Sequence, residues 1–374
     1  MRLWPFRGRP APASPSADDL LITEEVLRRN VEDLMAVRAR EIRGGIVAFR
    51  GRLTTEPSRA LDILLERFSR FGYTPFLRPQ GEEVLLQAWP LAVTVERQRI
   101  GVHVVLFLLT CLTTLLAGSH AFFAFDPLEE PGRILHGVPF AFTLLGILGT
   151  HEFGHYFTAR YYKASVSLPY FIPAPPPTFG TFGAIIRMRS PVKNRNSLFD
   201  IAVAGPLAGL VIAVPAILLG FEWSRVAPVT PGAMVFGDSL LMRFLVYLKF
   251  GSIPSGMDVY IHPVALAGWV GLLVTALNLF PVGQLDGGRI AYALFGRRHR
   301  AVGIATFLAL LGLGAVTGSA NWLVWAALLF VMVGFHHSPP LDDVTPLTHA
   351  RRLVGFACLI LLVLLIPPVP VDIS

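Results

Sequence analysis

Long apolar runs dominate the chain from residue 100 onwards. A helix needs about 20 apolar residues to cross the roughly 30 Å hydrocarbon core of a bilayer. We therefore predict about seven membrane spans in a membrane-embedded domain at residues 100–374, at 101–123, 137–162, 199–221, 263–283, 301–318, 321–337 and 352–370. The apolar stretch 234–251 contains three charged residues, which favours a helix in the membrane interface over a span.

The first 99 residues lack such long apolar runs and instead show short helix-like and strand-like patterns. Residues 20–43 place Leu, Ile and Val at helical spacing, whereas residues 44–53 alternate as a strand does. A second helical stripe runs over 57–71, and two short strands then flank a Pro-Gln-Gly turn. We predict a soluble α/β head domain at 19–99, with a leading helix before a βαββ unit. Residues 1–18, rich in Pro, Ala and Ser, are expected to be a disordered tail.

Composition supports this division. Hydrophobic residues make up 53% of the chain and charged residues only 15%, against about 25% charged residues in an ordinary globular domain. About half of the charged side chains lie within the first 99 residues. The net charge of +7 comes from Arg clusters that flank apolar runs, so the lipid bilayer is the expected partner and nucleic acid is not.

The charged loops also predict the orientation. Basic residues gather at 160–195, 289–300 and 351–352, whereas the loop at 124–136 is acidic. By the positive-inside tendency, the fold is a polytopic α-helical membrane protein whose head is cytoplasmic and whose 124–136 and 222–262 loops lie outside. With seven spans, the C-terminus would also lie outside.

One predicted span contains the pattern His-Glu-x-x-His. His151 and His155 are four residues apart, so both imidazoles lie on one helical face and can reach one metal ion, with Glu152 beside them as a base. Ionisable residues within a membrane span are costly and are functional candidates by default. The alternative is that Glu152 only pairs with a neighbouring His.

Catalytic zinc requires a third protein ligand. Asp286, in NLFPVGQLDGG (278–288), ends an apolar run beside two glycines that allow the backbone to bend. Asp200 is the competing acid, but its place at a loop edge favours a role in starting a helix.

These motifs together resemble the site-2 protease family of intramembrane zinc metalloproteases, peptidase family M50. The resemblance rests on HEFGH (151–155), on NLFPVGQLDGG (278–288) and on the Gly-rich AGPLAG (204–209) between them. The phrases SLPYFIPAPP and GTFGAIIRMRSPVKNR further suggest the bacterial branch similar to the plastid ethylene-dependent gravitropism-deficient and yellow-green proteins.

The resemblance implies one Zn²⁺ per chain, held by His151, His155 and Asp286, with Glu152 as general base and acid. By the same analogy Asn278 would hydrogen-bond the substrate backbone or the oxyanion. The alternative for Asn278 is a polar contact that holds helices together.

The Pro- and Gly-rich segment 163–198 cannot form a regular span. Irregular backbone at membrane depth is tolerated only where it is buried in protein or lines a cavity. We interpret GTFGAIIRMRS as a strand edge that pairs with an unwound substrate segment, or else as a cytoplasmic loop without a substrate role. The predicted substrate-binding residues in it are Gly180, Thr181, Phe182, Gly183 and Ala184.

We therefore expect a zinc endopeptidase that cleaves membrane proteins within or beside a spanning helix. A bacterial inner membrane is the expected location, ahead of a plastid membrane. The alternatives are a membrane transporter that uses buried His, Glu and Asp for metal or protons, and an inactive protease-like scaffold. The oligomeric state does not follow from the sequence.

Overall fold

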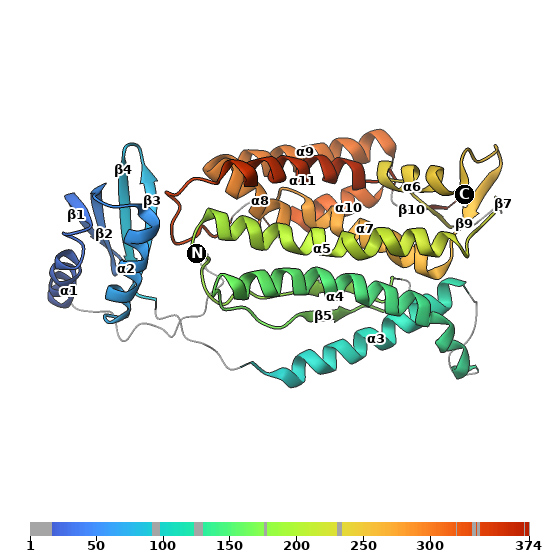
Figure 1. Cartoon of the computed structure of the whole chain (residues 1–374), viewed down its shortest axis with the longest axis horizontal. Helices are drawn as coiled ribbons and strands as arrows, with labels where there is room; N and C mark the ends of the chain where they lie inside the picture. The colour runs from blue at the N-terminus through green and yellow to red at the C-terminus, as the bar shows by residue number, and fades with distance from the viewer. Residues whose placement is uncertain are drawn as a thin grey trace.

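The computed structural model describes residues 17–91, 98–122, 130–175, 178–229, 234–318, 320–330, 334, 337–369 and 371–373. A small α/β head lies at one end of an elongated helical body (Figure 1). The tail predicted for residues 1–18 lies outside the described residues, except for Ala17 and Asp18, which begin the first helix.

The head is one antiparallel sheet packed against helices. The sheet has the strand order β1-β2-β4-β3, and Leu61, Leu64 and Phe68 of α2 are fully buried in the head's own hydrophobic core. The elements of the head are α1 (Ala17–Arg29), β1 (Met35–Arg43), β2 (Ile46–Leu53), α2 (Pro57–Ser69), β3 (Thr74–Gln80) and β4 (Glu83–Trp89).

The single helix predicted over residues 20–43 is wrong. The helix ends at Arg29, and β1 then pairs antiparallel with β2. From Met35 onwards alternate side chains are exposed, and exposed Arg38 pairs with Glu83 of β4 at 2.9 Å. Arg and Glu are tolerated on the exposed face of a half-buried sheet. Strand pairing therefore outweighs the helix propensity of this segment. The head is thus ββαββ after its leading helix.

The body is mostly helical, with short strand pairs between the helices. Its helices are α3 (Ile100–Phe122), η1 (Pro131–Gly137), α4 (Val138–Tyr161), α5 (Arg195–Phe221), α6 (Leu240–Phe250), α7 (Pro263–Leu279), α8 (Asp286–Phe295), η2 (Gly296–Arg298), α9 (His299–Thr317), α10 (Ala320–Leu328) and α11 (His349–Leu365). Its strands are β5 (Tyr170–Pro173), β6 (Thr181–Ile185), β7 (Arg225–Pro228), β8 (Met234–Phe236), β9 (Met257–Tyr260) and β10 (Val371–Ile373).

Within the described residues, four helical stretches are long and apolar enough to cross a membrane. They are Ile100–Ala121, Pro131–Tyr161, Arg195–Phe221 and Asp286–Thr317. The apolar helix Pro263–Leu279 is shorter, because the chain turns before Asp286 and begins a new helix there. The mostly helical fold with candidate membrane-spanning helices and an N-terminal α/β region is therefore confirmed, and the count of seven spans is not.

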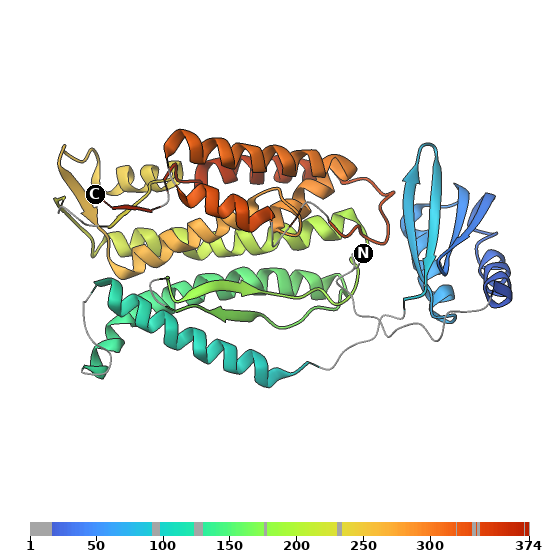
Figure 2. The same cartoon turned by 180° about the vertical axis from the view of Figure 1, so that it is seen from behind.

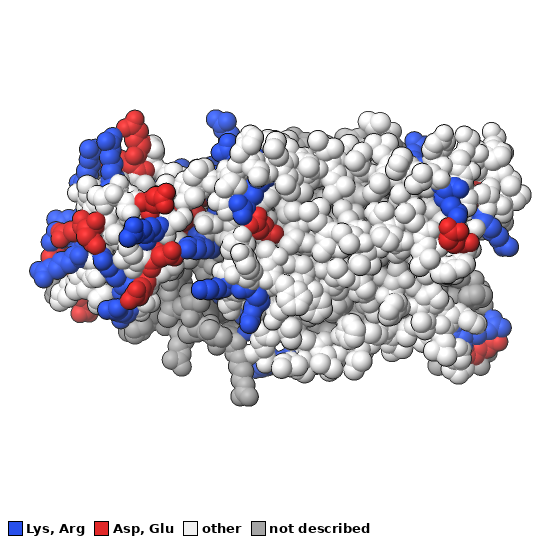
Figure 3. Space-filling model, in the orientation of Figure 1, with Lys and Arg blue, Asp and Glu red and all other residues white. Residues whose placement is uncertain are grey.

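The distribution of charged side chains agrees with a head and a membrane-embedded body. On the face shown in Figure 3, Arg, Lys, Asp and Glu gather over the head and at the far end of the body, with an uncharged band between them. The strand β10 pairs with β8 at the end opposite the head. The chain's last described residues therefore lie at the same end of the body as β8.

The β5–β6 hairpin runs along α3 and α4, as Figure 2 shows from behind. The Thr113 hydroxyl of α3 donates to the carbonyl of Gly180 at 2.6 Å and fixes the turn of the hairpin. The segment 163–198 is thus not a span, and its Thr181–Ile185 stretch is a strand, as the sequence predicts. Pro176 and Pro177 lie outside the described residues.

Candidate metal centre

The helix α4 places three polar side chains in the interior of the body. His151, Glu152 and His155 are only 3–5% exposed, although they lie on a mainly apolar helix. The Nε2 atoms of the two histidines are 3.1 Å apart. Two imidazoles whose nitrogens approach this closely share one binding position.

Asp286, the first residue of α8, completes this group. Its Oδ2 lies 3.0 Å from His155 Nε2 and 3.4 Å from His151 Nε2. The chain can turn into α8 here because Gly287 has no side chain: a Cβ at this position would come within 1.9 Å of the Leu279 carbonyl oxygen. The glycine after Asp286 therefore lets the end of α7 and the start of α8 approach each other and bring Asp286 under the histidines.

The helix α5 orients one of the histidines. The Nδ1 atom of His155 lies 2.6 Å from the carbonyl oxygen of Ile201. A carbonyl only accepts, so Nδ1 carries the proton and Nε2 presents its lone pair towards Asp286 and His151. Gly205 and Gly209 of AGPLAG lie against His155 and His151. The motif thus brings α5 into contact with the pair of histidines.

The geometry of the three ligand atoms fits zinc. Zn²⁺ binds His nitrogens and carboxylate oxygens at about 2.0–2.1 Å in a tetrahedral arrangement, which separates the ligand atoms by about 3.3 Å. The three separations observed here are 3.0, 3.1 and 3.4 Å. Three protein ligands leave one position open, which is typical of catalytic rather than structural zinc sites. Within the described residues, His151, His155 and Asp286 form the one group of three such side chains that could hold a metal ion.

Of the other predicted residues, Asn278 lies closest to the histidines, and the rest lie on or beside the β5–β6 hairpin. The amide Nδ2 of Asn278 lies 3.5 Å from His151 Nε2, so Asn278 is beside the metal position. The backbone of Ile186, one residue beyond β6, interacts with the Glu152 carboxylate. Phe182 of β6 is 69% exposed. The Thr181 hydroxyl donates to the Ile172 carbonyl across the hairpin at 2.8 Å.

Asp200 does not belong to the centre. Both of its carboxylate oxygens accept from the Arg351 guanidinium at 2.7 Å, and the Tyr162 hydroxyl donates to it as well. The role predicted for Asp200 in starting a helix is wrong, because α5 begins five residues earlier, at Arg195. Asn194 caps that helix by accepting from the Ser197 N–H, as Asn commonly does.

The contact that sequence patterns did not reveal is the Ile201 carbonyl. A backbone acceptor is not specified by its own side chain, so nothing in residue 201 marks it. The nearest sequence signal is AGPLAG, whose small residues indicate a close helix approach.

The comparisons with known proteins agree with this geometry. Peptidase family M50 matches residues 139–317, which include all four residues of the centre. The probable zinc metalloprotease EGY2, chloroplastic, of Oryza sativa subsp. indica is 32% identical over 91% of this chain and 65% of its own length. The probable zinc metalloprotease EGY1, chloroplastic, of Arabidopsis thaliana is 36% identical over 62% of this chain and 43% of its own.

The chain therefore spans less than two thirds of the length of these relatives. No solved structure matches it. The matched region contains the metal-binding group, so the chain is similar to peptidase family M50 over residues 139–317 and to the EGY zinc metalloproteases over the shares given above.

Proposed function

We propose that this protein is an intramembrane zinc endopeptidase that hydrolyses peptide bonds of membrane proteins within or beside a spanning helix. The observation that carries the proposal is the buried group of His151, His155 and Asp286 with Glu152 beside it. The two histidines and Glu152 lie inside a helical stretch long and apolar enough to span a membrane, and Asp286 begins another such stretch. Unpaired acids in such a helix are costly, and a metal ion would offset that cost.

The residues present supply the other parts of a hydrolytic mechanism. When bound, zinc supplies the Lewis acidity that activates a water molecule and polarises a peptide carbonyl. Glu152 accepts a proton of that water as the water oxygen bonds to the carbonyl carbon. It then passes the proton to the peptide nitrogen, so that the C–N bond breaks and an amine and a carboxylate are released. The Ile201 carbonyl keeps the His155 ring in place. Asn278 is positioned to donate to a substrate oxygen next to His151.

The outer edge of β6 is the proposed substrate-binding edge. Arg187 directs its backbone inward: its N–H donates to Ser167 Oγ at 2.9 Å and its carbonyl accepts from the Ser167 N–H at 3.0 Å. We propose that Ile186 and Ala184 direct their backbone groups to the other edge. That edge faces Glu152 at Ile186. An unwound substrate segment that pairs there would replace the backbone hydrogen bonds lost from its own helix.

The metal centre lies near the head-side end of α4. His155 lies six residues before the end of α4, which corresponds to about 9 Å along a helix axis. We infer that water enters from this side, that the head is cytoplasmic and that the 222–262 loop is outside. The apolar helices fit a membrane protein. The similar proteins are named chloroplastic and give no support to a bacterial inner membrane.

A cleavage screen distinguishes this proposal from a transporter or an inactive scaffold. Single-span membrane proteins would be co-expressed with the wild-type chain or with Glu152→Gln, and the products would be identified by mass. The proposal expects defined products with the wild type and none with the variant. A wild-type chain that moves zinc or protons across vesicles and cuts no membrane protein would favour the transporter.

A further inference from the structure

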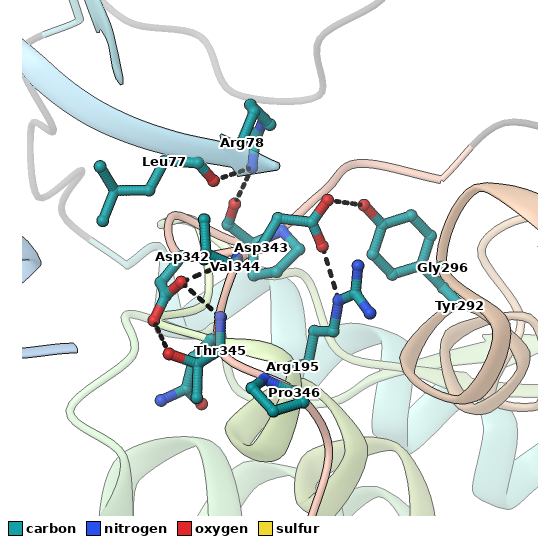
Figure 4. Close-up of polar contacts among 12 residues, drawn as sticks. Leu77, Arg78, Arg195, Tyr292, Gly296, Asp342, Asp343, Val344, Thr345 and Pro346 are labelled. Atoms are coloured by element: carbon teal, nitrogen blue, oxygen red, sulfur yellow. Dashed lines mark hydrogen bonds and ion pairs between the residues drawn. The ribbon is translucent and has the colours of Figure 1, made fainter. Parts of the chain in front are cut away.

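A short segment after α10 joins the head to the body. On one side, the Leu77 N–H of β3 donates to the Leu341 carbonyl at 2.7 Å and the Asp343 N–H donates to the Leu77 carbonyl at 3.0 Å. On the other side, Leu341 and Asp342 donate to the carbonyls of residues 192 and 193 at 2.9 and 2.8 Å. Residues 341–343, named here the bridging segment, thus extend the head's sheet at its β3 edge and connect it to the residues before α5 (Figure 4).

Side chains of the head hold this segment from one side. The guanidinium of Arg78 donates to the Pro340 carbonyl at 2.6 Å. The Ser58 hydroxyl donates to Asp342, whose other carboxylate oxygen accepts from the Val344 and Thr345 N–H groups. Asp342 is fully buried, and a buried carboxylate is stable only when its oxygens are bonded in this way.

Asp343 points instead into the body. One of its oxygens accepts from Arg195 Nε at 2.8 Å and the other from the Tyr292 hydroxyl at 3.0 Å. Arg195 is the first residue of α5, and Tyr292 lies on α8. The Asp343 side chain is only 4% exposed, so removal of its charge would leave Arg195 without its partner in a site that water reaches poorly.

The same two helices meet at the metal centre. Ile201 lies six residues after Arg195 on α5, and Asp286 lies six residues before Tyr292 on α8. Six residues correspond to about 9 Å along a helix. Ile201 and Asp286 then contact the two nitrogens of the same ring, at His155 Nδ1 and Nε2. A shift of α5 against α8 would therefore change both contacts of His155.

We propose that docking of the head fixes the spacing of α5 and α8 at the metal centre through the bridging segment, with Asp343 as the positioning residue and Arg78 as its anchor on the head. This role rests on the metal centre of the proposed function, but it is tested by metal binding and by head docking and does not require catalysis.

The first measurement uses cobalt(II) in place of zinc in the full chain, because its visible absorption bands report ligand geometry. Asp343→Asn keeps the shape of the side chain and removes the charge that faces Arg195. We expect shifted bands and about threefold to tenfold weaker cobalt binding. Asp62→Asn is the matched control: its exposed pair with Lys193 also joins head and body, but it does not contact the bridging segment. This variant should keep the wild-type bands and affinity.

The second measurement follows docking directly. The chain has lysines only at 163, 193 and 249. A carbodiimide should couple Lys193 to Asp62 (2.7 Å) across the head–body junction, and Lys249 to Glu222 (2.6 Å) at the far end. The second coupling is an internal reference with similar exposure. Arg78→Gln should lower the yield of the first coupling relative to the second and shift the cobalt bands in the direction seen with Asp343→Asn.

Several results would overturn the inference. Wild-type cobalt bands and affinity in Asp343→Asn would show that Asp343 does not position the centre. An unchanged junction coupling in Arg78→Gln would exclude Arg78 as the anchor, and a lowered coupling with an unchanged cobalt site would exclude the link between docking and the centre. If Asp62→Asn changed the cobalt bands and affinity as much as Asp343→Asn does, the effect would belong to any charge at the head–body junction and not to Asp343. The proposed function fails separately, if Glu152→Gln still cleaves substrate.

Discussion

Gly205 of α5 lies so close to the ring of His155 that a Cβ at position 205 would come within 2.1 Å of Nε2. Real Cβ atoms do not approach other atoms this closely, and an imidazole held on its other side by Ile201 has little freedom to move. The Gly-rich motif of α5 is therefore a steric requirement of the metal centre.

Gly205→Ala should displace His155 and lower zinc affinity by at least about tenfold, as changes around metal ligands commonly do. Zinc content after dialysis against a graded chelator measures this. Gly146→Ala on α4 is the control, because a Cβ there meets no atom within 4 Å. Equal zinc binding by the two variants would contradict the close contact.

The three proposed ligands can be tested against the competing acid. His151→Ala, His155→Ala and Asp286→Ala should each remove most of the bound zinc, measured by elemental analysis of the purified protein. Asp200→Ala should keep its zinc and instead lower the melting temperature, because Arg351 loses its bidentate partner. If Asp200→Ala empties the site while Asp286→Ala retains zinc, the third ligand is assigned wrongly.

A proline tests the substrate edge of β6. Ala184→Pro removes an N–H from the outer edge, so it should slow cleavage several-fold with zinc content unchanged. Ala184→Val keeps the N–H and enlarges the side chain, which makes it the matched control. Ile186→Pro would also disturb the backbone group that contacts Glu152, and it is therefore the less specific variant. Cleavage by Ala184→Pro at the wild-type rate would exclude strand pairing at this residue.

The orientation can be measured with two serine-to-cysteine changes. The background would have Cys111 and Cys358 replaced by Ala. Ser69 on the head and Ser255 beyond α6 are both exposed. A membrane-impermeant thiol reagent should label Ser69→Cys only from the cytoplasmic side and Ser255→Cys only from outside. The reverse pattern would overturn both the orientation and the proposed route of water.

The local chemistry of the centre was predictable from the sequence. His151 and His155 fall one turn apart on any helix, and the glycines after Asp286 indicated a sharp turn. Within the predicted βαββ unit of the head, the strands over 44–53 and around the Pro-Gln-Gly turn and the helix over 57–71 are each present. These features depend on neighbours within a few residues along the chain.

Features that depend on distant partners were not predictable. Residues 35–43 have apolar residues at helical spacing, yet they form a strand that pairs with β2. The sequence predicted that Asp200 starts a helix. In the structure Asp200 instead pairs with Arg351, which lies 151 residues away in the chain. The pair Asp342–Asp343 gave no sign of connecting the head to α5 and α8, because its side-chain contacts with those parts lie between 51 and 284 residues away.

The central claim is tested most directly by hydrolysis in isotopic water. Purified wild-type protein and Glu152→Gln would be reconstituted, each with zinc content verified, in vesicles with a single-span substrate in H₂¹⁸O. The proposal predicts a cut within or beside the span and one ¹⁸O atom in the new carboxyl terminus. It also predicts a rate about 10²–10⁴-fold lower in Glu152→Gln, the usual contribution of a general base. Cleavage by zinc-loaded Glu152→Gln at the wild-type rate, or no cleavage of any membrane substrate by the zinc-loaded wild type, would contradict it.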